Sequence, residues 1–214
     1  CDAVVLRVFR HRTIEEFAEH SSVPVINGLS DYNHPCQALG DLLTIQEAFG
    51  SLEGRTLVFV GDGNNVARSL VVACARAGMR FVLAAPKGYQ FDESFLATCR
   101  TAFPGHLPIQ ESDPARAVAD ADVIYSDVWT SMGQEAETAK RLRDFRGFEV
   151  NESLMAKAPA HAKFMHCLPA HRGEEVSAGV MESKASLVFP QAGNRMHAQK
   201  ALLCWLLASH ITKS

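Results

Sequence analysis

The sequence contains no long apolar run, no basic block and no closely spaced pair of cysteines. No stretch approaches the ~20 apolar residues that a membrane-spanning helix needs. Charged residues make up 21% of the 214 residues and the formal net charge is −3, so we expect neither a nucleic-acid nor a membrane partner. The six cysteines are scattered without a C-x-x-C pair, which favours reduced thiols over a disulfide framework.

The sequence also lacks an initial Met and any signal or transit segment. We therefore expect the natural N-terminus to lie upstream of Cys1. The scattered thiols indicate a reducing compartment, either the cytoplasm or an organelle matrix or stroma. An apolar content of 47% is that of an ordinary globular protein.

Short apolar runs alternate with segments of helical periodicity. The expected strands, some of them ending in turns, cover 2–9, 23–31, 56–60, 80–86, 107–113, 122–130, 162–169 and 186–195. The expected helices cover 13–21, 34–50, the stretch from the glycine turn to 79, 93–103, 115–121, 136–148, 152–159, 177–183 and 196–211. This alternation predicts the α/β class, with a doubly wound, Rossmann-like parallel sheet covered by helices on both faces.

Three segments differ in how much core they can bury. Residues 51–190 hold a complete strand–helix alternation and are predicted to form one doubly wound domain. Residues 1–50 are predicted to be the tail of another α/β domain, because they are too short to bury a core alone. Residues 191–214 are predicted to form a terminal helix that packs back on the first domain.

A glycine turn, GDGNN at 61–65, follows an expected strand and opens a helix, where an anion or a dinucleotide can bind. Val66 stands at the third glycine position of the dinucleotide motif, and 84–87 lacks the ribose-binding acid, so a nicotinamide cofactor is disfavoured. The remaining interpretations are a tight turn alone and a polar small-molecule site at Asn64 and Asn65. We favour the second.

Two further loops carry polar side chains at the ends of expected elements. In HPCQ, His34 can donate to an oxyanion and Gln37 can bind an amide at a helix start, unless His34 only caps that helix. In DVWTSMGQE, Asp127 leaves a strand and is expected to face the crevice beyond the sheet. The alternative for this loop is a helix start capped by Ser131 and Glu135.

The fourth loop is HCLP, at 166–169. Zinc is conceivable at His161, His166, Cys167 and His171, but their spacing is unlike the standard ligand pairs, so no metal is expected. A nucleophilic Cys167 needs an activating base. His166 is adjacent, but neighbours on a strand face opposite ways. The alternative is a buried, inert thiol.

Taken in order, HPCQ, GDGNN, DVWTSMGQE, HCLP and NRMHAQ resemble the ornithine carbamoyltransferases, over the whole chain. The S-M-G loop is the most discriminating piece, since it differs in aspartate carbamoyltransferases. The resemblance implies transfer of the carbamoyl group from carbamoyl phosphate to the δ-amine of L-ornithine, giving L-citrulline and phosphate, as in arginine biosynthesis or the urea cycle. It implies no cofactor, and a homotrimer for the full-length protein. Residues 1–50 would then belong to the carbamoyl-phosphate domain and 51–190 to the ornithine domain.

The resemblance also implies roles for individual residues. Carbamoyl phosphate would contact Arg7, His34, Gln37 and Arg195. The amino-acid end of ornithine would be held by Asn65, Asp127, Ser131 and Met132. Cys167 and Leu168 would lie where the two substrates meet, with a cis Leu168–Pro169 peptide. The residues expected to be catalytic are Cys167, Asp127, Arg7 and His34, and Cys167 is expected to position the amine and handle its proton.

The sequence departs from this resemblance at two points. The S-x-R-T-R clamp for phosphate is absent, so we expect a fragment that does not turn over on its own. Gly193 stands where the family usually has Glu, which would loosen the orientation of Arg195. The alternative functions are a carbamoyltransferase for another amine such as putrescine, a nicotinamide-dependent oxidoreductase, and a non-catalytic subunit.

Overall fold

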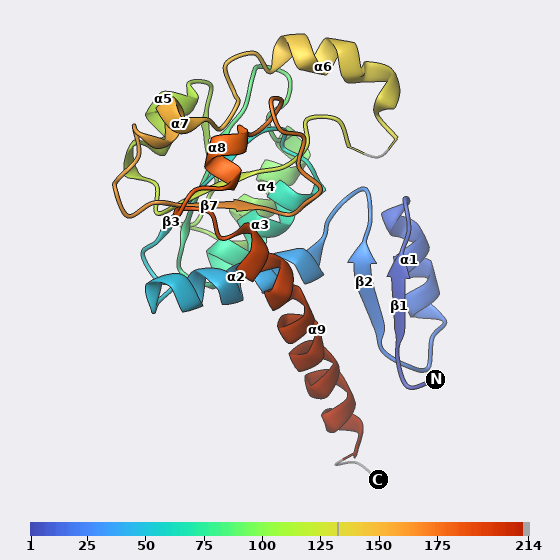
Figure 1. The fold of residues 1–214 in the computed structure, drawn as a ribbon. Coiled ribbons are helices and arrows are strands. Elements are labelled where there is room, and N and C mark those ends of the chain that lie inside the picture. The colour runs from blue at the N-terminus through green and yellow to red at the C-terminus, as the bar shows by residue number, and fades with distance from the viewer. Residues whose placement is uncertain (132, 212–214) are drawn as a thin grey trace.

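The computed structural model describes residues 1–131 and 133–211. Its largest element is a parallel sheet with the strand order β5-β4-β3-β6-β7 (Figure 1). The strands are β3 (Thr56–Val60), β4 (Arg80–Ala84), β5 (Ile109–Glu111), β6 (Val123–Ser126) and β7 (Lys163–His166). Every neighbouring pair is parallel, which confirms the prediction made from the strand–helix alternation.

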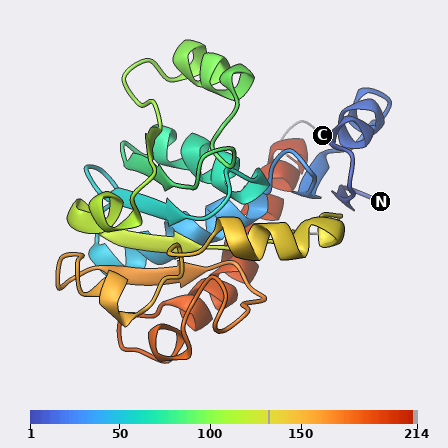
Figure 2. The same cartoon turned by 90° about the horizontal axis from the view of Figure 1, so that it is seen from above.

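Helices cover both faces of this sheet. They are α2 (Pro35–Phe49), α3 (Asn65–Arg76), α4 (Glu93–Ala102), α5 (Pro114–Ala117), α6 (Thr138–Asp144), α7 (Glu152–Met155), α8 (Ala178–Met181) and α9 (Val188–Ile211), with 3₁₀ turns at Val118–Asp120 and Glu135–Glu137. Figure 2 shows α4 on one side of the sheet and α7 and α8 on the other. Because both faces are covered, β3 is buried along its whole length. The architecture is therefore doubly wound α/β, as predicted.

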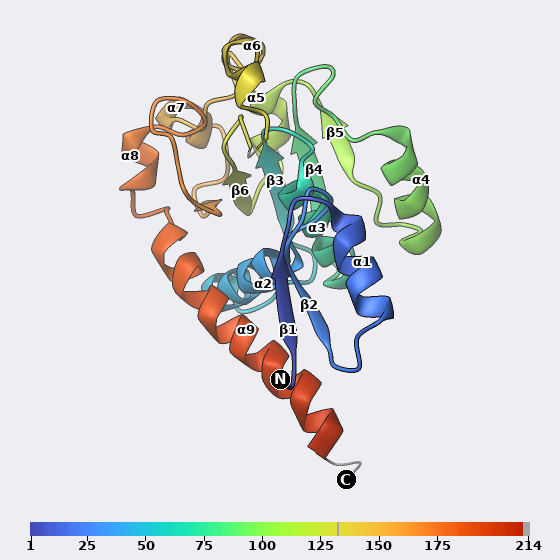
Figure 3. The same ribbon diagram turned by 90° about the vertical axis from the view of Figure 1, so that its right-hand side faces the viewer.

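A smaller unit precedes this sheet. In it, β1 (Val4–Arg7) and β2 (Val25–Leu29) pair in parallel and are joined by α1 (His11–Glu19). The register shifts between Leu6 and Arg7, so that Arg7 lies opposite Leu29. Figures 1 and 3 show this unit standing beside the large sheet, with α2 leading from one to the other.

The strand predicted at 186–195 is wrong, because α9 begins at Val188 and only Ser186 makes a strand-like bridge, to Phe164. Val188, Gln191 and Asn194 are all buried, a spacing of three that is typical of one helix face and not of a strand. Pro190 lies in the first turn, where it costs no hydrogen bond. The other predicted elements are present, most of them with shorter spans. β3 has its predicted span, α1 begins two residues earlier than predicted, and α9 is longer than predicted.

The terminal helix α9 packs along α2, which lies within residues 1–50 (Figure 3). Side chains of α9 donate three hydrogen bonds across this interface. Gln191 Nε2 donates to Asp41 Oδ1 at 2.7 Å, and Asn194 Nδ2 donates to Thr44 Oγ1 at 3.1 Å and to Glu47 Oε2 at 2.6 Å. The contact therefore joins the last element of the chain to a helix that begins at the HPCQ motif.

All six cysteines are free, and Cys36, Cys74 and Cys99 are buried. This confirms the predicted lack of a disulfide framework. Among the helices that the structure describes, none combines the length and the apolar character needed to cross a membrane.

Gly50 and Gly193 form a matched pair for a test of these helices. Gly50 ends α2 with φ at 75°, Gly193 lies inside α9, and an added Cβ would meet nothing within 4 Å at either position. Gly50→Ala should lower the free energy of unfolding by about 1 kcal/mol through backbone strain alone. Gly193→Ala should raise it by about 0.5–1 kcal/mol, because alanine favours the helix. Urea denaturation measures both, and a loss of stability in both variants would contradict these assignments.

Candidate active site

A cleft of about 1010 Å³ lies at the carboxyl ends of the strands. It opens between the loops after β3 and β6, where the strand order reverses direction, which is the usual ligand site in open α/β sheets. Every predicted site residue that the structure describes lines this cleft: Arg7, His34, Gln37, Asn65, Asp127, Ser131, Cys167, Leu168 and Arg195. Met132 was also predicted, but it lies outside the described residues.

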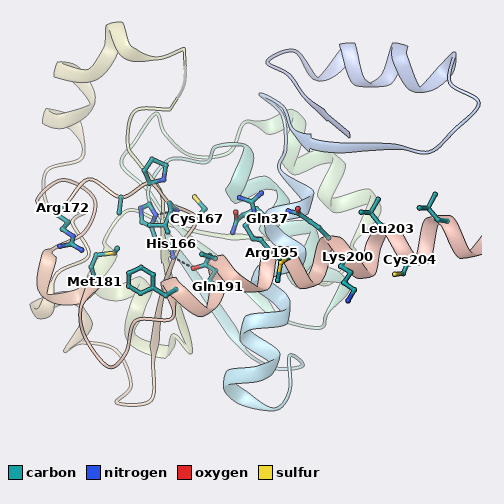
Figure 4. Close-up of a pocket in the computed structure, with 18 of the residues that line it drawn as sticks. Gln37, His166, Cys167, Arg172, Met181, Gln191, Arg195, Lys200, Leu203 and Cys204 are labelled. Atoms are coloured by element: carbon teal, nitrogen blue, oxygen red, sulfur yellow. Dashed lines mark hydrogen bonds between the residues drawn. The ribbon is translucent and has the colours of Figure 1, made fainter. Parts of the chain in front are cut away.

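A second cavity, of about 1400 Å³, runs along α9 (Figure 4). Its lining is mostly apolar and includes Met181, Phe189 and Leu203. The two cavities meet at Gln37, Cys167, Leu168, Pro169 and Arg195, which line both of them. We identify the smaller cleft as the candidate active site, because the charged and polar side chains gather there.

Asp127 is the centre of the cleft's hydrogen-bond network. Its Oδ2 accepts from Asn64 Nδ2 at 2.7 Å, and its Oδ1 accepts from the Cys167 thiol at 3.0 Å and from the Val128 N–H at 2.8 Å. Asn64, Asp127 and Cys167 follow the neighbouring strands β3, β6 and β7. The sheet therefore brings together three side chains that lie up to 103 positions apart in the sequence.

In this pair the Cys167 thiol is the hydrogen-bond donor and the Asp127 carboxylate is the acceptor. Burial raises the pKa of the Cys167 thiol well above its ordinary value, and the nearby charge of Asp127 raises it further. A protonated thiol is a poor nucleophile. The site thus favours a positioning and proton-handling role for Cys167 over covalent catalysis.

His166 does not act as a base for Cys167. Its Nδ1 accepts the Leu168 N–H at 2.9 Å, and its Nε2 lies 3.2 Å from Glu175 Oε1. Since Nδ1 accepts, Nε2 must carry the proton and donate to Glu175. Both ring nitrogens are therefore occupied in holding the HCLP turn, in which Leu168 has φ at 57° and the Leu168–Pro169 peptide is cis, as expected.

The other end of the cleft is cationic. Arg7 lies at the end of β1, His34 precedes α2, and Arg195 lies on α9. Burial, and to a lesser extent the charges of Arg195 and Arg7, lower the pKa of His34 to about 4. His34 is therefore neutral near pH 7 and can donate one N–H, while the two guanidiniums supply positive charge.

Three buried polar atoms at this end have no hydrogen-bond partner among the described residues: His34 Nδ1, Gln37 Oε1 and Arg195 Nε. Buried polar atoms are nearly always paired in proteins, and unpaired ones need an explanation. His34 occupies the N-cap position of α2, but its ring makes no capping bond, so capping does not account for it. The unpaired atoms indicate a site for a ligand that has both donors and acceptors.

The sequence predicted that Asn64 and Asn65 of the GDGNN turn bind a polar ligand, but in the structure both side chains hydrogen-bond to other parts of the protein. Asn65 lines the cleft, but its Nδ2 donates to Ser30 O at 2.7 Å and ties the turn to β2. Asn64 caps α3 through Ala67 N–H and contacts Asp127. The sequence named Asn64 as part of a polar small-molecule site but did not indicate its contact with Asp127, which lies 63 positions away.

An ion pair between Asp62 and Arg141 was also missed. Arg141 Nη1 lies 2.5 Å from Asp62 Oδ2 and donates to Trp129 O at 2.9 Å, so the pair holds the loop after β6 against the GDGNN turn. The two residues are 79 positions apart, which sequence patterns do not connect. Ser131 makes no side-chain cap on the elements that follow it.

One group among the described residues has a spacing that could suit a metal ion: His171, Glu174 and Glu175. Glu175 Oε1 is already engaged, because it accepts the His171 N–H at 2.6 Å and faces His166. None of these three residues belongs to the Asp127 network.

Comparisons with known proteins agree with this geometry. Residues 53–206 match the family described as aspartate/ornithine carbamoyltransferase, Asp/Orn binding domain, and residues 1–47 match the corresponding carbamoyl-P binding domain. The ornithine carbamoyltransferase of Anoxybacillus flavithermus is 51% identical over 208 residues, which cover 96% of this chain and 66% of that protein. The chain thus spans just under two thirds of the length of such curated relatives.

Solved structures give the same result. The ornithine carbamoyltransferase of Pyrococcus furiosus superposes with a TM-score of 0.91 at 50% identity, covering 97% of this chain and 67% of that one. The enzyme of Gloeobacter violaceus gives a TM-score of 0.88 at 42% identity, covering 96% and 70%. Both match the two sheets and the terminal helix together, because nearly the whole chain is covered.

The protonated state of Cys167 can be tested by alkylation. Because burial and the Asp127 carboxylate both raise its pKa, iodoacetamide should modify Cys167 far more slowly at pH 8 than it modifies exposed Cys204. Asp127→Asn removes the negative charge, so it should lower the pKa of Cys167 and speed its alkylation, with no change at Cys204. Mass spectrometry gives the site-specific rates. Faster labelling of Cys167 than of Cys204 in the wild type would refute this protonation state.

The neutral state of His34 predicts a pH response. The unfolded His34 protonates near pH 6.5 and the folded one only near pH 4, so its contribution to stability is complete above pH 6.5 and declines as the pH falls toward 4. NMR of the imidazole should show no titration of His34 between pH 5.5 and 8. Arg195→Leu should raise its pKa, since a repelling charge is removed. Titration of His34 near pH 6.5 in the wild type would contradict the buried, cationic setting.

Proposed function

Because this chain belongs to the aspartate/ornithine carbamoyltransferase family, we propose that the protein transfers the carbamoyl group of carbamoyl phosphate to the δ-amine of L-ornithine. The products are L-citrulline and phosphate. The observation that carries the proposal is a single cleft with a cationic end at Arg7, His34 and Arg195 and a carboxylate at Asp127 beside Cys167. Such a cleft suits an anionic acyl donor and an amino acid with a free ammonium group.

The cationic end would bind carbamoyl phosphate. As the amine attacks, negative charge grows on the carbonyl oxygen, and one well-placed donor to that oxygen is typically worth about 3 kcal/mol in the transition state. The N–H of neutral His34 and the guanidiniums of Arg7 and Arg195 are the donors available in this cleft. Gln37 would bind the amino group of the carbamoyl moiety.

The other end would bind ornithine. Asp127 is the carboxylate that would pair with its α-ammonium group, while Asn65, Ser131 and Met132 would hold the rest of the amino-acid end. Putrescine has a second ammonium group at the same four-carbon spacing but lacks the α-carboxylate, so preference for ornithine would depend on the groups that bind that carboxylate. The Cys167 thiol donates to Asp127, which leaves a sulfur lone pair free to accept an N–H of the δ-amine.

The bond changes need no covalent enzyme intermediate. The lone pair of the neutral δ-amine forms the new C–N bond, the C–O bond to phosphate breaks, and phosphate leaves as an anion with the bonding pair. The amine releases one proton, which the Cys167 and Asp127 pair is placed to guide and which the departing phosphate takes up, so that phosphate leaves as HPO₄²⁻. Leu168 belongs to the same turn and would contact the donor beside it.

The whole protein would act as a homotrimer, in the cytoplasm or an organelle matrix. The 214 residues hold no S-x-R-T-R clamp for phosphate. We therefore expect the 214-residue chain alone to bind carbamoyl phosphate weakly, and turnover to need the full-length protein.

The test is citrulline formation by the full-length protein. Ornithine with carbamoyl phosphate should give citrulline, and putrescine should react at least about 100-fold more slowly because it lacks the α-carboxylate and leaves the groups that would bind it unpaired. Cys167→Ser should lower the rate by about 100-fold, the typical contribution of a placed proton-transfer group. Cys204→Ser, on exposed α9 surface, is the matched control and should retain the wild-type rate.

Two outcomes would count against the proposal. No citrulline from the wild type would remove the assigned reaction. A Cys167→Ser variant with unchanged rate and unchanged ornithine KM would remove the role of the thiol while leaving the reaction itself in place.

A further inference from the structure

A buried carboxylate, Asp41, lies on α2 one helical turn after Gln37 and is fully enclosed. Three donors converge on it. Its Oδ1 accepts from Gln37 Nε2 at 2.9 Å and from Gln191 Nε2 at 2.7 Å, and its Oδ2 accepts from the Tyr125 hydroxyl at 3.1 Å. These partners come from α2, α9 and β6, and the mechanism above makes no use of Asp41.

The orientation of both glutamine amides follows from this network. Gln191 Oε1 accepts the backbone N–H of His166 at 2.9 Å, and a backbone N–H can only donate. The Gln191 amide must therefore turn its NH₂ group toward Asp41. Asp41 Oδ1 is an acceptor, so Gln37 must also turn its NH₂ group toward it, and the Gln37 carbonyl oxygen must face the other way.

That carbonyl oxygen is one of the unpaired buried atoms of the cleft. Gln37 lines both cavities where they meet, together with Arg195 and Cys167, around the first turns of α9 (Figure 4). An acceptor held without a partner at this point selects a ligand that brings a donor. A methyl group there would leave the oxygen unpaired.

We propose that Asp41 is a positioning residue that sets donor specificity: by clamping the Gln37 amide, it makes the cleft accept an acyl phosphate whose carbonyl carbon bears an NH₂ group and reject one bearing a methyl group. The proposal rests on the proposed function and deepens it. The two donors that it separates are carbamoyl phosphate and acetyl phosphate, which have nearly the same shape and charge.

The clamp does not depend on the charge of Asp41. Burial raises the pKa of Asp41 to about 7, against the opposing effect of its three hydrogen bonds. A proton would sit on Oδ2, where Tyr125 can accept it, and Oδ1 would stay an acceptor for both amides. Gln37 therefore keeps the same orientation in either state.

The experiment measures a ratio on the full-length protein: the inhibition constant of acetyl phosphate divided by the KM of carbamoyl phosphate. The wild type should give a ratio of about 100, as expected when a buried acceptor loses its donor. Asp41→Leu, of similar volume, frees the Gln37 amide and should lower the ratio below about 10. Asp41→Asn keeps an oxygen at the Oδ1 position and should restore most of the ratio, while the ornithine KM stays within about twofold of wild type.

A double-mutant cycle tests whether Asp41 acts through Gln37. Gln37→Met removes the carbonyl oxygen and should lower the ratio as Asp41→Leu does, and the double variant should show no further fall. Thr44→Val is the matched control, because it removes another buried polar link between α2 and α9. It should lower stability and leave the ratio unchanged.

The outcomes separate the two proposals. A folded Asp41→Leu variant with the wild-type ratio, or a Gln37→Met variant with that ratio, would overturn the inference alone. Should Asp41→Leu not fold, Asp41→Ala takes its place, since a ratio of two affinities reports only on folded protein. Absence of citrulline formation by the wild type would overturn the proposed function and this inference with it.

Discussion

The register of β3, β6 and β7 is the constraint on which the candidate site depends. Val60 lies opposite Ser126, and Ser126 lies opposite His166, so the next residues along β6 and β7, Asp127 and Cys167, leave the sheet at the same level. A slip of one residue would turn every side chain of a strand to the opposite face. The bond between the Cys167 thiol and Asp127 exists only because the parallel ladder holds this register, and the buried apolar strands are what fix it.

The two ends of the cleft differ in charge: one is lined by cationic side chains and the other by a carboxylate. At one end, burial keeps His34 neutral, and the charges of Arg195 and Arg7 add to this effect. At the other, Asp127 is surrounded by donors, Asn64 and the Cys167 thiol. Unpaired buried atoms are costly, by roughly 1–3 kcal/mol each, and three of those among the described residues, on His34, Gln37 and Arg195, gather at the cationic end of the cleft.

The contact between α2 and α9 connects the small unit to the large sheet. His34 precedes α2 and Gln37 lies in its first turn, while α9 carries Gln191 and Arg195, so the packing of the two helices sets how the cationic end of the cleft faces Asp127. The buried Asp41 lies in this interface and touches β6 through Tyr125. One carboxylate therefore ties together the three elements that meet behind the cleft, and its satisfied hydrogen bonds restrict them to one arrangement.

The sequence by itself determined the helices, the strands and the four loops. Apolar periodicity sets each helix or strand, and glycine and proline end it, through local backbone preferences. It predicted the doubly wound sheet, the turn at GDGNN and the gathering of Asp127 and Cys167, since carboxyl ends of parallel strands share one edge. The place of Arg195, which lies on α9, was expected only from the resemblance to a known family. It failed at 186–195, where an apolar run that resembles a strand begins α9, because only burial against α2 reveals the helical spacing. It also omitted Arg141 and Asp41 and did not indicate the contact between Asn64 and Asp127, because these partners lie on other elements. Tertiary structure alone decided those pairings. A hydrogen bond depends on the distance between two atoms in space, and it produces no periodic pattern in the sequence.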